Sequence, residues 1–338
     1  MPAVLSMHFL VTKFRSTSSS CFLTSHKISS SDVQPNPRDM AEQLKEEQIG
    51  NLTHETTVIR DHIDLDRFEA AIEGMNLLTF DAEGVDLSRI GQATILSIGV
   101  LNEDHVQVFV FDLLQKDDTD FYAREIGIMS KVLEDPSVIK IIHDCREDSD
   151  ALNTFHNIRL TGVFDTSIYN MRIKGVEKRD NLNNTLSHYG CDINSIRNKP
   201  KGFYDMNPTY WADRPLTEEQ IEWAGGDVAS LFKLRERLLE AVPAGKLEAI
   251  QRASEYALSD LRSMGYHTIV KVAKSSVGKV IGKMGCNIQS IEDQSGAFIS
   301  NSLRGFLVVA GSQASLNEAK DLIERKANQS YHRHSDYH

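Results

Sequence analysis

Four acidic residues in three separate segments have the types and the spacing that a pair of divalent cations requires. Asp81 and Glu83 follow a short apolar run, Asp148 comes five residues after His143, and Asp227 lies much further along the chain. Hard cations such as Mg²⁺ and Mn²⁺ prefer carboxylate oxygens, and two of them held about 4 Å apart activate a water for attack on a phosphodiester. We therefore expect the four acids to converge around two divalent metal ions, Mg²⁺ or Mn²⁺, because without metal they would repel one another.

The segments before the first three acids read as strands. Residues 77–80 are apolar, and in an extended chain positions i and i+2 face the same side, so Asp81 and Glu83 project together. Residues 138–142 have the composition of a buried strand and lead into the start of a helix, which carries Asp148.

The last acid is expected on a helix. Thr217 can cap this helix and Gln220 can close a capping box, and apolar residues continue the helical period behind them. Asp227 then lies about one turn beyond Trp223. Gly225 and Gly226 weaken a helix by about 1 kcal/mol each, so we expect another backbone or a ligand to approach closely there.

Taken in order, these segments resemble the three exonuclease motifs of the RNase D-like group of the DEDD superfamily. The motifs are Asp81-x-Glu83, residues 143–148, and residues 214–220 with Asp227. Residues 143–146 and 207–215 are most similar to the Egalitarian-like exonuclease-domain proteins. Three ordered motifs with matching strand and helix context are far more specific than any one of them.

The resemblance implies an α/β domain of the ribonuclease H-like kind, with a mixed sheet. Its strands are expected near Leu77, Ala93, Val106, Ile139 and Val163. Break-forming residues 242–245 end the long helix, and residues 246–264 read as a further helix that packs on this domain or links it to the next.

The resemblance also implies a role for each acid. Asp81 would bridge both metals, Glu83 and Asp227 would complete the shell of the first metal, and Asp148 would hold the second through water. The family has a tyrosine four residues before the last aspartate, which positions the attacking water, and here Trp223 takes that place. An indole N–H only donates a hydrogen bond and cannot act as a base, so reduced activity or another way of holding the water is expected. The alternative for Trp223 is a plain core aromatic.

Several acids near the motifs are decoys. We expect four of them to be helix caps or surface groups, namely Asp86, Asp144, Glu147 and Asp150. Asp165 also matches a sequence motif of the family, but we expect it to be a helix cap.

A second module follows the helical linker. The order strand, helix, helix, strand, strand, helix, with Ile-Gly-Lys-Met-Gly-x-x-Ile at residues 281–288, resembles a small α+β type I KH domain. KH modules hold about four nucleotides of single-stranded RNA or DNA beside such a loop. Glycines let backbone approach phosphates and lysines add charge, which makes the expected nucleic-acid contacts Lys279, Gly282, Lys283, Met284 and Gly285. Residues 268–328 carry eight Lys or Arg and five Asp or Glu, whereas the whole chain has a net charge of −11.

These signals divide the chain as follows: residues 1–39, disordered and a possible transit peptide; 55–242, exonuclease domain; 243–266, helical linker; 267–328, KH domain; 329–338, disordered tail. The first 31 residues contain no acid and are Ser-rich, which fits an organellar (mitochondrial or plastid) transit peptide or a bland tail equally well. Without it, a cytoplasmic or nuclear location is expected. No apolar run approaches a membrane span, and the four cysteines show neither a disulfide framework nor zinc-ligand spacing, so the protein is expected to be intracellular.

Two functions follow from the sequence. The first is a metal-dependent 3′-5′ exonuclease acting on single-stranded RNA or DNA, with the KH domain holding the nucleic acid. The second is an RNA-binding adaptor whose exonuclease fold is a scaffold of weak or no activity, because Trp223 replaces the family tyrosine. The sequence leaves open RNA against DNA, Mg²⁺ against Mn²⁺, and the oligomeric state.

Overall fold

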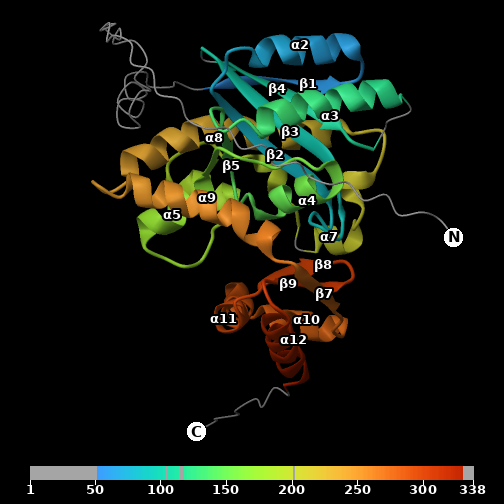
Figure 1. The fold of residues 1–338 in the computed structure, drawn as a ribbon, viewed down its shortest axis with the longest axis vertical. Coiled ribbons are helices and arrows are strands. Elements are labelled where there is room, and N and C mark those ends of the chain that lie inside the picture. Colours follow the sequence, from blue (N-terminus) through green and yellow to red (C-terminus); the bar gives the residue numbers. More distant parts are fainter. Residues whose placement is uncertain (1–51, 104, 115–117, 201, 330–338) are drawn as a thin grey trace, which may run out of the picture. The chain divides into compact units, whose positions relative to one another are not determined.

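The larger sheet has six strands in the order β1-β4-β3-β2-β5-β6 (Figure 1). The computed structural model describes residues 52–103, 105–114, 118–200 and 202–329. The expected N-terminal segment and all but the first residue of the expected tail lie outside these ranges. The strands are β1 Thr53–Ile59, β2 Leu77–Val85, β3 Gln92–Asn102, β4 His105–Asp112, β5 Ile139–Ile142 and β6 Val163–Asp165.

This sheet is mixed, as predicted. β3 runs antiparallel to both β2 and β4, whereas the pairs β1–β4, β2–β5 and β5–β6 are parallel. All five expected strands are present. β1 was not predicted, and it is an edge strand whose first half is exposed, so it lacks the apolar run that marks the buried strands.

Helices cover both faces of the sheet. On β4, Phe109 and Phe111 face one core with α2 (His62–Ile72) and α3 (Thr119–Leu133), while Val108 and Val110 face a second core with α8 (Glu218–Ala241). Strands buried on both faces read as continuous apolar runs, which is why the central strands were recognisable in the sequence. The helix that carries Asp227 thus also helps to bury this second face of the sheet.

The long helix α8 begins as the sequence predicts. The Thr217 hydroxyl accepts the backbone N–H of Gln220, and the Gln220 side chain accepts the backbone N–H of Thr217, which completes the capping box. The helix ends at Ala241, before Pro243. Its two glycines let neighbours approach closely, but those neighbours are side chains: a Cβ on Gly225 would meet Thr56 Oγ1 at 2.3 Å.

The linker helix α9 (Leu247–Ser263) packs on the sheet domain. Ile250 and Leu258 enter its two cores, and the Tyr169 hydroxyl donates to Gln251 Oε1 at 2.8 Å. At the end of α9 the Arg89 guanidinium donates to the carbonyls of Leu261 and Met264, both at 2.6 Å. Since the last carbonyls of a helix have no partner within it, Arg89 supplies the donors that they lack.

The second, smaller fold has the predicted order of elements and its own core. Its antiparallel sheet has the order β7-β9-β8, with three helices packed on it. The elements are β7 Tyr266–Val270, α10 Lys274–Ile281, α11 Cys286–Ser295, β8 Phe298–Ser302, β9 Gly305–Ala310 and α12 Gln313–Asn328.

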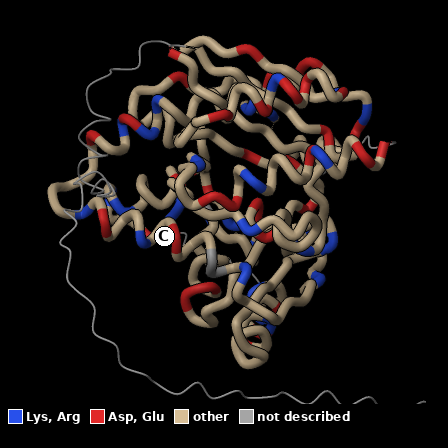
Figure 2. Tube along the Cα trace, turned by 45° about the horizontal axis from the view of Figure 1, so that its top comes forward, with Lys and Arg blue, Asp and Glu red and all other residues tan. Residues whose placement is uncertain are grey.

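Charged residues of both signs are distributed along the described chain. Figure 2 shows Lys and Arg interspersed with Asp and Glu instead of segregated into separate segments. None of the described helices has the length and apolar character that a membrane span needs. Of the four cysteines, Cys145, Cys191 and Cys286 lie in described segments, and all three are free thiols.

Candidate active site

The central strand β2 carries the first two acids of the predicted site. Asp81 and Glu83 are partly exposed, while Ala82 between them is buried against the opposite core. This alternation is the period-2 pattern expected of a strand. β2 lies between β3 and β5, so both carboxylates emerge from the middle of the sheet.

Asp227 joins these two acids from helix α8. One carboxylate oxygen from each of Asp81, Glu83 and Asp227 lies within 4.8 Å of the others. Asp227 reaches them because α8 packs its apolar side, including Val228 and Leu231, on the same face of the sheet. Residues 144 positions apart therefore meet through the packing of one helix on one strand.

Asp148 lies beside this trio but is oriented differently. It belongs to the first turn of α4 (Arg146–His156), and its Oδ1 accepts the backbone N–H of Ala82 at 3.0 Å. The position suits a negative charge, because unpaired N–H groups gather at a helix N-terminus. Asp148 is not one of the three acids whose oxygens lie within 4.8 Å of one another.

All four carboxylates resist ionisation together. Burial, followed by the nearby charge of Asp227, raises the pKa of Asp81 to about 7. Burial and then Asp81 likewise raise the pKa values of Glu83 and Asp148. Burial raises the pKa of Asp227, although the charge of Arg197 and several hydrogen bonds oppose this. A cluster of this kind gains most from an added positive charge.

Trp223 is both a core aromatic and a hydrogen-bond donor to the site. It is 3% exposed, and its ring packs edge-on against Trp211 with centroids 5.2 Å apart. Its Nε1–H donates to Asp227 Oδ2 at 3.0 Å. The two alternatives drawn from the sequence therefore describe the same side chain. Its catalytic role remains a prediction.

Three residues of the site were missed in the sequence, and all lie on the loop around the short 3-10 turn η1 (Ser195–Arg197). Asn194 Nδ2 donates to Asp227 Oδ1 at 2.8 Å and to the Trp223 carbonyl at 2.9 Å. Arg197 forms an ion pair with Asp227. Lys199 Nζ lies 5.4 Å from the centroid of the Trp223 ring. The loop has no hydrophobic period or motif, and its one local signal is Asn194, a residue type that favours turns.

The decoy acids have structural partners, but not all of them are at the surface. Asp165 caps α5 (Thr166–Lys174), as predicted. Asp150 was expected at a cap or the surface, which is wrong: it is 1% exposed and pairs with Arg89 at 2.8 Å. Asp144 and Glu147 are partly buried, Asp144 pairs with Arg146, and burial raises the pKa of Glu147 to about 7.

The glycine loop of the second fold has the backbone that the sequence predicts. Gly282 (φ 76°) and Gly285 (φ 80°) both lie in the left-handed region, which only glycine adopts without strain. A Cβ on Gly282 would also meet Asn287 at 2.7 Å. Lys283 between them is exposed, whereas the Lys279 ammonium donates to the Gln329 carbonyl at 3.2 Å. Nucleic-acid contacts by these residues and by Met284 remain predictions.

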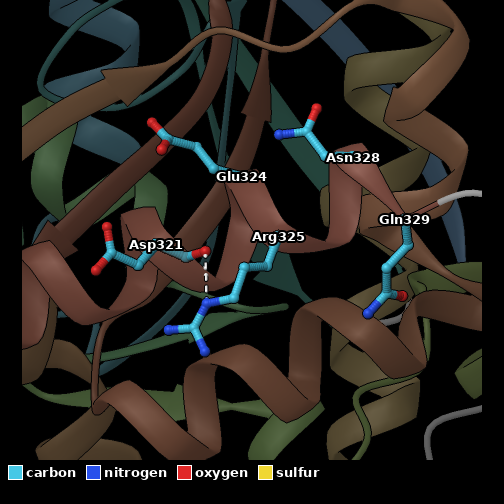
Figure 3. A pocket seen from close by; sticks show the side chains of 5 residues that line it. All are labelled: Asp321, Glu324, Arg325, Asn328 and Gln329. Atoms are coloured by element: carbon cyan, nitrogen blue, oxygen red, sulfur yellow. Dashed lines mark hydrogen bonds between the residues drawn. The ribbon is translucent and has the colours of Figure 1, made fainter.

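A shallow hollow on α12 contains none of the predicted site residues (Figure 3). It is lined by Asp321, Glu324, Arg325, Asn328 and Gln329, and Arg325 Nε donates to the Asp321 carbonyl at 3.3 Å. These groups are a mixed set of surface charges and amides along one helix. The hollow carries no chemistry comparable to that of the acidic trio.

Comparisons with known proteins match both parts of the chain to known families. A family model described as 3′-5′ exonuclease matches residues 56–243, and a KH domain model matches residues 267–325. The piRNA biogenesis protein EXD1 of Bombyx mori is 30% identical over 180 residues, which cover 51% of this chain and 54% of that protein. Human EXD1 is 26% identical over 187 residues, which cover 52% of this chain and 35% of that protein. The chain thus spans about half the length of these relatives, or less.

A solved structure shares the fold. The structure of Trypanosoma brucei RNase D in complex with RNA U12 superposes with a TM-score of 0.50 and 19% identity, covering 65% of this chain and 72% of that one. At this identity the likeness concerns the fold alone. Together, these matches confirm the predicted resemblance to RNase D-like exonucleases followed by a KH domain, and the predicted fold class.

Proposed function

The chain belongs to the 3′-5′ exonuclease family, and from that premise we propose that it is a metal-dependent 3′-5′ exonuclease that shortens single-stranded RNA. In this proposal residues 55–242 catalyse the reaction, and residues 267–328 provide a second binding site for the RNA. The observation that carries the proposal is the meeting of Asp81, Glu83 and Asp227 within 4.8 Å.

The residues of the site fit divalent metal ions. Three carboxylates offer hard oxygen ligands to one point. Burial and then the charges of neighbouring acids raise the pKa values of Asp81 and Glu83, and a cation would relieve both effects. Asp148 is close enough to Asp81 for its pKa to respond to that charge, which fits its proposed role at a second ion. When bound, Mg²⁺ or Mn²⁺ would supply a polarised phosphate and a water that loses its proton more easily.

The protein itself would orient these ligands. Asn194 and Trp223 each donate to a different oxygen of Asp227, which fixes the plane of its carboxylate. The backbone N–H of Ala82 does the same for Asp148. A carboxylate held in one orientation loses little freedom when it binds a cation, so these donors favour binding.

Two phenols lie beside Trp223, and only one is well placed to replace the family tyrosine. The rings of Tyr204 and Tyr210 have centroids 6.4 and 6.0 Å from that of Trp223. Tyr210 donates to Glu219 at 2.7 Å. For Tyr204, burial and then the charge of Glu83 raise the pKa to about 12, so its hydroxyl stays protonated at neutral pH. We assign to Tyr204 the positioning of the water, as a neutral phenol.

The choice of RNA rests on the second fold and on a neighbour. A KH domain binds single-stranded nucleic acid, and the glycine loop of this chain has the backbone to approach phosphates. The Trypanosoma brucei neighbour was solved in complex with RNA U12. Linking a second contact to a nuclease raises the local concentration of substrate at the acids.

The adaptor function is less well supported. A scaffold has no need to keep acidic residues in mutual repulsion, and the matching family model is that of an exonuclease. Trp223 is the observation in favour of an adaptor, and the position of Tyr204 weakens that argument.

The test is a nuclease assay on a 5′-end-labelled single-stranded RNA with Mg²⁺ or Mn²⁺. We expect a ladder of products that shorten stepwise, and release of a labelled mononucleotide when the same RNA carries its label at the 3′ end. A DNA strand of the same sequence measures the preference for RNA. Asp81→Asn should abolish the ladder, whereas Glu248→Gln, an exposed acid on α9, should leave it unchanged. RNA binding without shortening in either metal would leave only the adaptor.

A further inference from the structure

Arg197 is held at the acidic site by the loop that carries it. Asn194 caps η1, since its side chain accepts the Ile196 N–H at 3.2 Å. Asn183 bonds both the N–H and the carbonyl of Asn194, at 3.1 and 2.9 Å. The loop is thus anchored at its start, and Arg197 at its end is directed toward α8.

The guanidinium of Arg197 occupies an oxygen that a metal would need. Arg197 Nη1 donates to Asp227 Oδ2, the same oxygen that accepts the Trp223 indole N–H. Asn194 donates to the other oxygen. A carboxylate offers about four lone-pair sites, so at least three of those on Asp227 already have donors. Asp227 is 1% exposed, and water cannot readily replace any of them.

The positive charge of Arg197 opposes the rise in the pKa of each of the three clustered acids, Asp81, Glu83 and Asp227. Burial opposes the charged form of Arg197, but Asp227, Glu83 and Asp81 outweigh burial and raise its pKa. Its side chain is 29% exposed, so the guanidinium has a route toward solvent. While it pairs with Asp227, its central carbon also lies 5.8 Å from the centroid of the Trp223 ring, within cation–π range.

We propose that Arg197 is a built-in competitor of the divalent cation, which neutralises the acids in the absence of metal and must leave Asp227 before a cation binds there. The proposal rests on the metal-dependent function proposed above. It gives the site two states: a closed one, in which Arg197 pairs with Asp227, and a loaded one, in which Arg197 is released toward solvent. Metal affinity is then set by how easily Arg197 leaves.

The experiment measures Mn²⁺ binding to the full chain in two ways. One is isothermal titration calorimetry, and the other is the loss of the electron paramagnetic resonance signal of free Mn²⁺. Arg197→Gln removes the charge and keeps an amide donor, and we expect its Mn²⁺ affinity to rise about tenfold above wild type. Arg197→Lys keeps a charge that separates more readily, and an intermediate gain is expected. Arg237→Gln removes an exposed arginine elsewhere on α8 and should bind Mn²⁺ as wild type does. In EDTA, Arg197→Gln should melt at a lower temperature than wild type, and Mn²⁺ should restore more of its stability.

Each outcome decides the proposal. A tighter Arg197→Gln that also melts earlier in EDTA supports it. Equal or weaker Mn²⁺ binding by Arg197→Gln overturns the competition and leaves the metal-dependent function intact. If Arg197→Gln does not fold, an affinity of Arg197→Lys no greater than wild type overturns it. The absence of Mn²⁺ binding in wild type and both variants overturns the competition and the metal dependence together.

Discussion

The indole N–H of Trp223 donates to Asp227 Oδ2 at 3.0 Å, one helical turn away on α8. The bond satisfies the buried carboxylate but gives the site a group that can only donate. Trp223 thus both orients the Asp227 carboxylate and packs in the aromatic core.

Replacing this indole with a phenol should raise the rate. In Trp223→Tyr a hydroxyl that can accept as well as donate enters the position, and we expect turnover on single-stranded RNA to rise at least about tenfold. Trp223→Phe removes the donor without adding a hydroxyl, so its rate should not rise. Single-turnover rates of the three proteins provide the comparison. An equal gain in both variants would point to relief of crowding and away from the phenol.

Removing the hydroxyl of Tyr204 should lower turnover without unfolding the protein. Tyr204 is 48% exposed and its hydroxyl is hydrogen-bonded to the buried Trp211 side chain, so Tyr204→Phe should cost about 1 kcal/mol of stability and remain folded. We expect turnover to fall about tenfold, with an unchanged affinity for RNA. Tyr210→Phe is the matched control on the other side of Trp223. Loss of turnover only in Tyr210→Phe would reverse the assignment.

Asn194 should contribute strongly to stability. Asn194→Ala removes the donor to Asp227 and the cap of η1, and leaving a buried carboxylate short of a partner costs about 2 kcal/mol. Urea unfolding measures this change. Asn317→Ala removes an exposed asparagine of α12 and should cost less than about 0.5 kcal/mol. A loss at position 194 no larger than this would show that Asp227 does not need the amide.

Stability should depend on pH through Lys140. This buried lysine of β5 donates to the carbonyl of Asp135 at 2.7 Å, and burial lowers its pKa from 10.5 to about 8. Between these pH values the unfolded chain binds more protons than the folded one, so stability rises with pH. From pH 8 to 10.5, wild type should gain about 2 to 3 kcal/mol over Lys140→Met. Parallel curves for the two proteins would mean that Lys140 stays charged in the fold.

The glycine loop should contribute to RNA affinity. Replacing Lys283 and Met284 together with Asp puts negative charge where phosphates are expected, and we predict at least about a tenfold loss of affinity for single-stranded RNA. Lys320→Asp changes an exposed lysine of α12 and controls for two of the three units of charge that the double variant changes. Melting temperatures verify that the fold persists. Equal losses in both proteins would assign the effect to charge in general.

Much of the fold was predictable because burial leaves a pattern in the sequence. The central strands are apolar on both faces, the start of α8 carries a capping box, and the backbone alternation of β2 puts Asp81 and Glu83 on one side. Each signal is local, in that its cause lies within a few residues.

The remainder depends on contacts between distant segments. Arg197 and Asn194 reach Asp227 only because their loop is anchored by Asn183, and no period marks that loop. In the sequence Asp150 resembles a surface acid, because its partner Arg89 lies 61 residues earlier in the chain. Side chains whose partners lie this far away carry no signature of their own.

The paired glycines of α8 limit how the protein can be engineered. A Cβ at Gly225 would collide with Thr56, and one at Gly226 would lie 2.8 Å from Asn194 Nδ2. Alanine, which ordinarily strengthens a helix interior by about 1 kcal/mol over glycine, would here displace the side chain of Thr56 on β1 or of Asn194 beside the site. A thermostability screen that scores each helix in isolation would choose these substitutions first, and at position 226 it would disturb Asn194, the donor that positions Asp227.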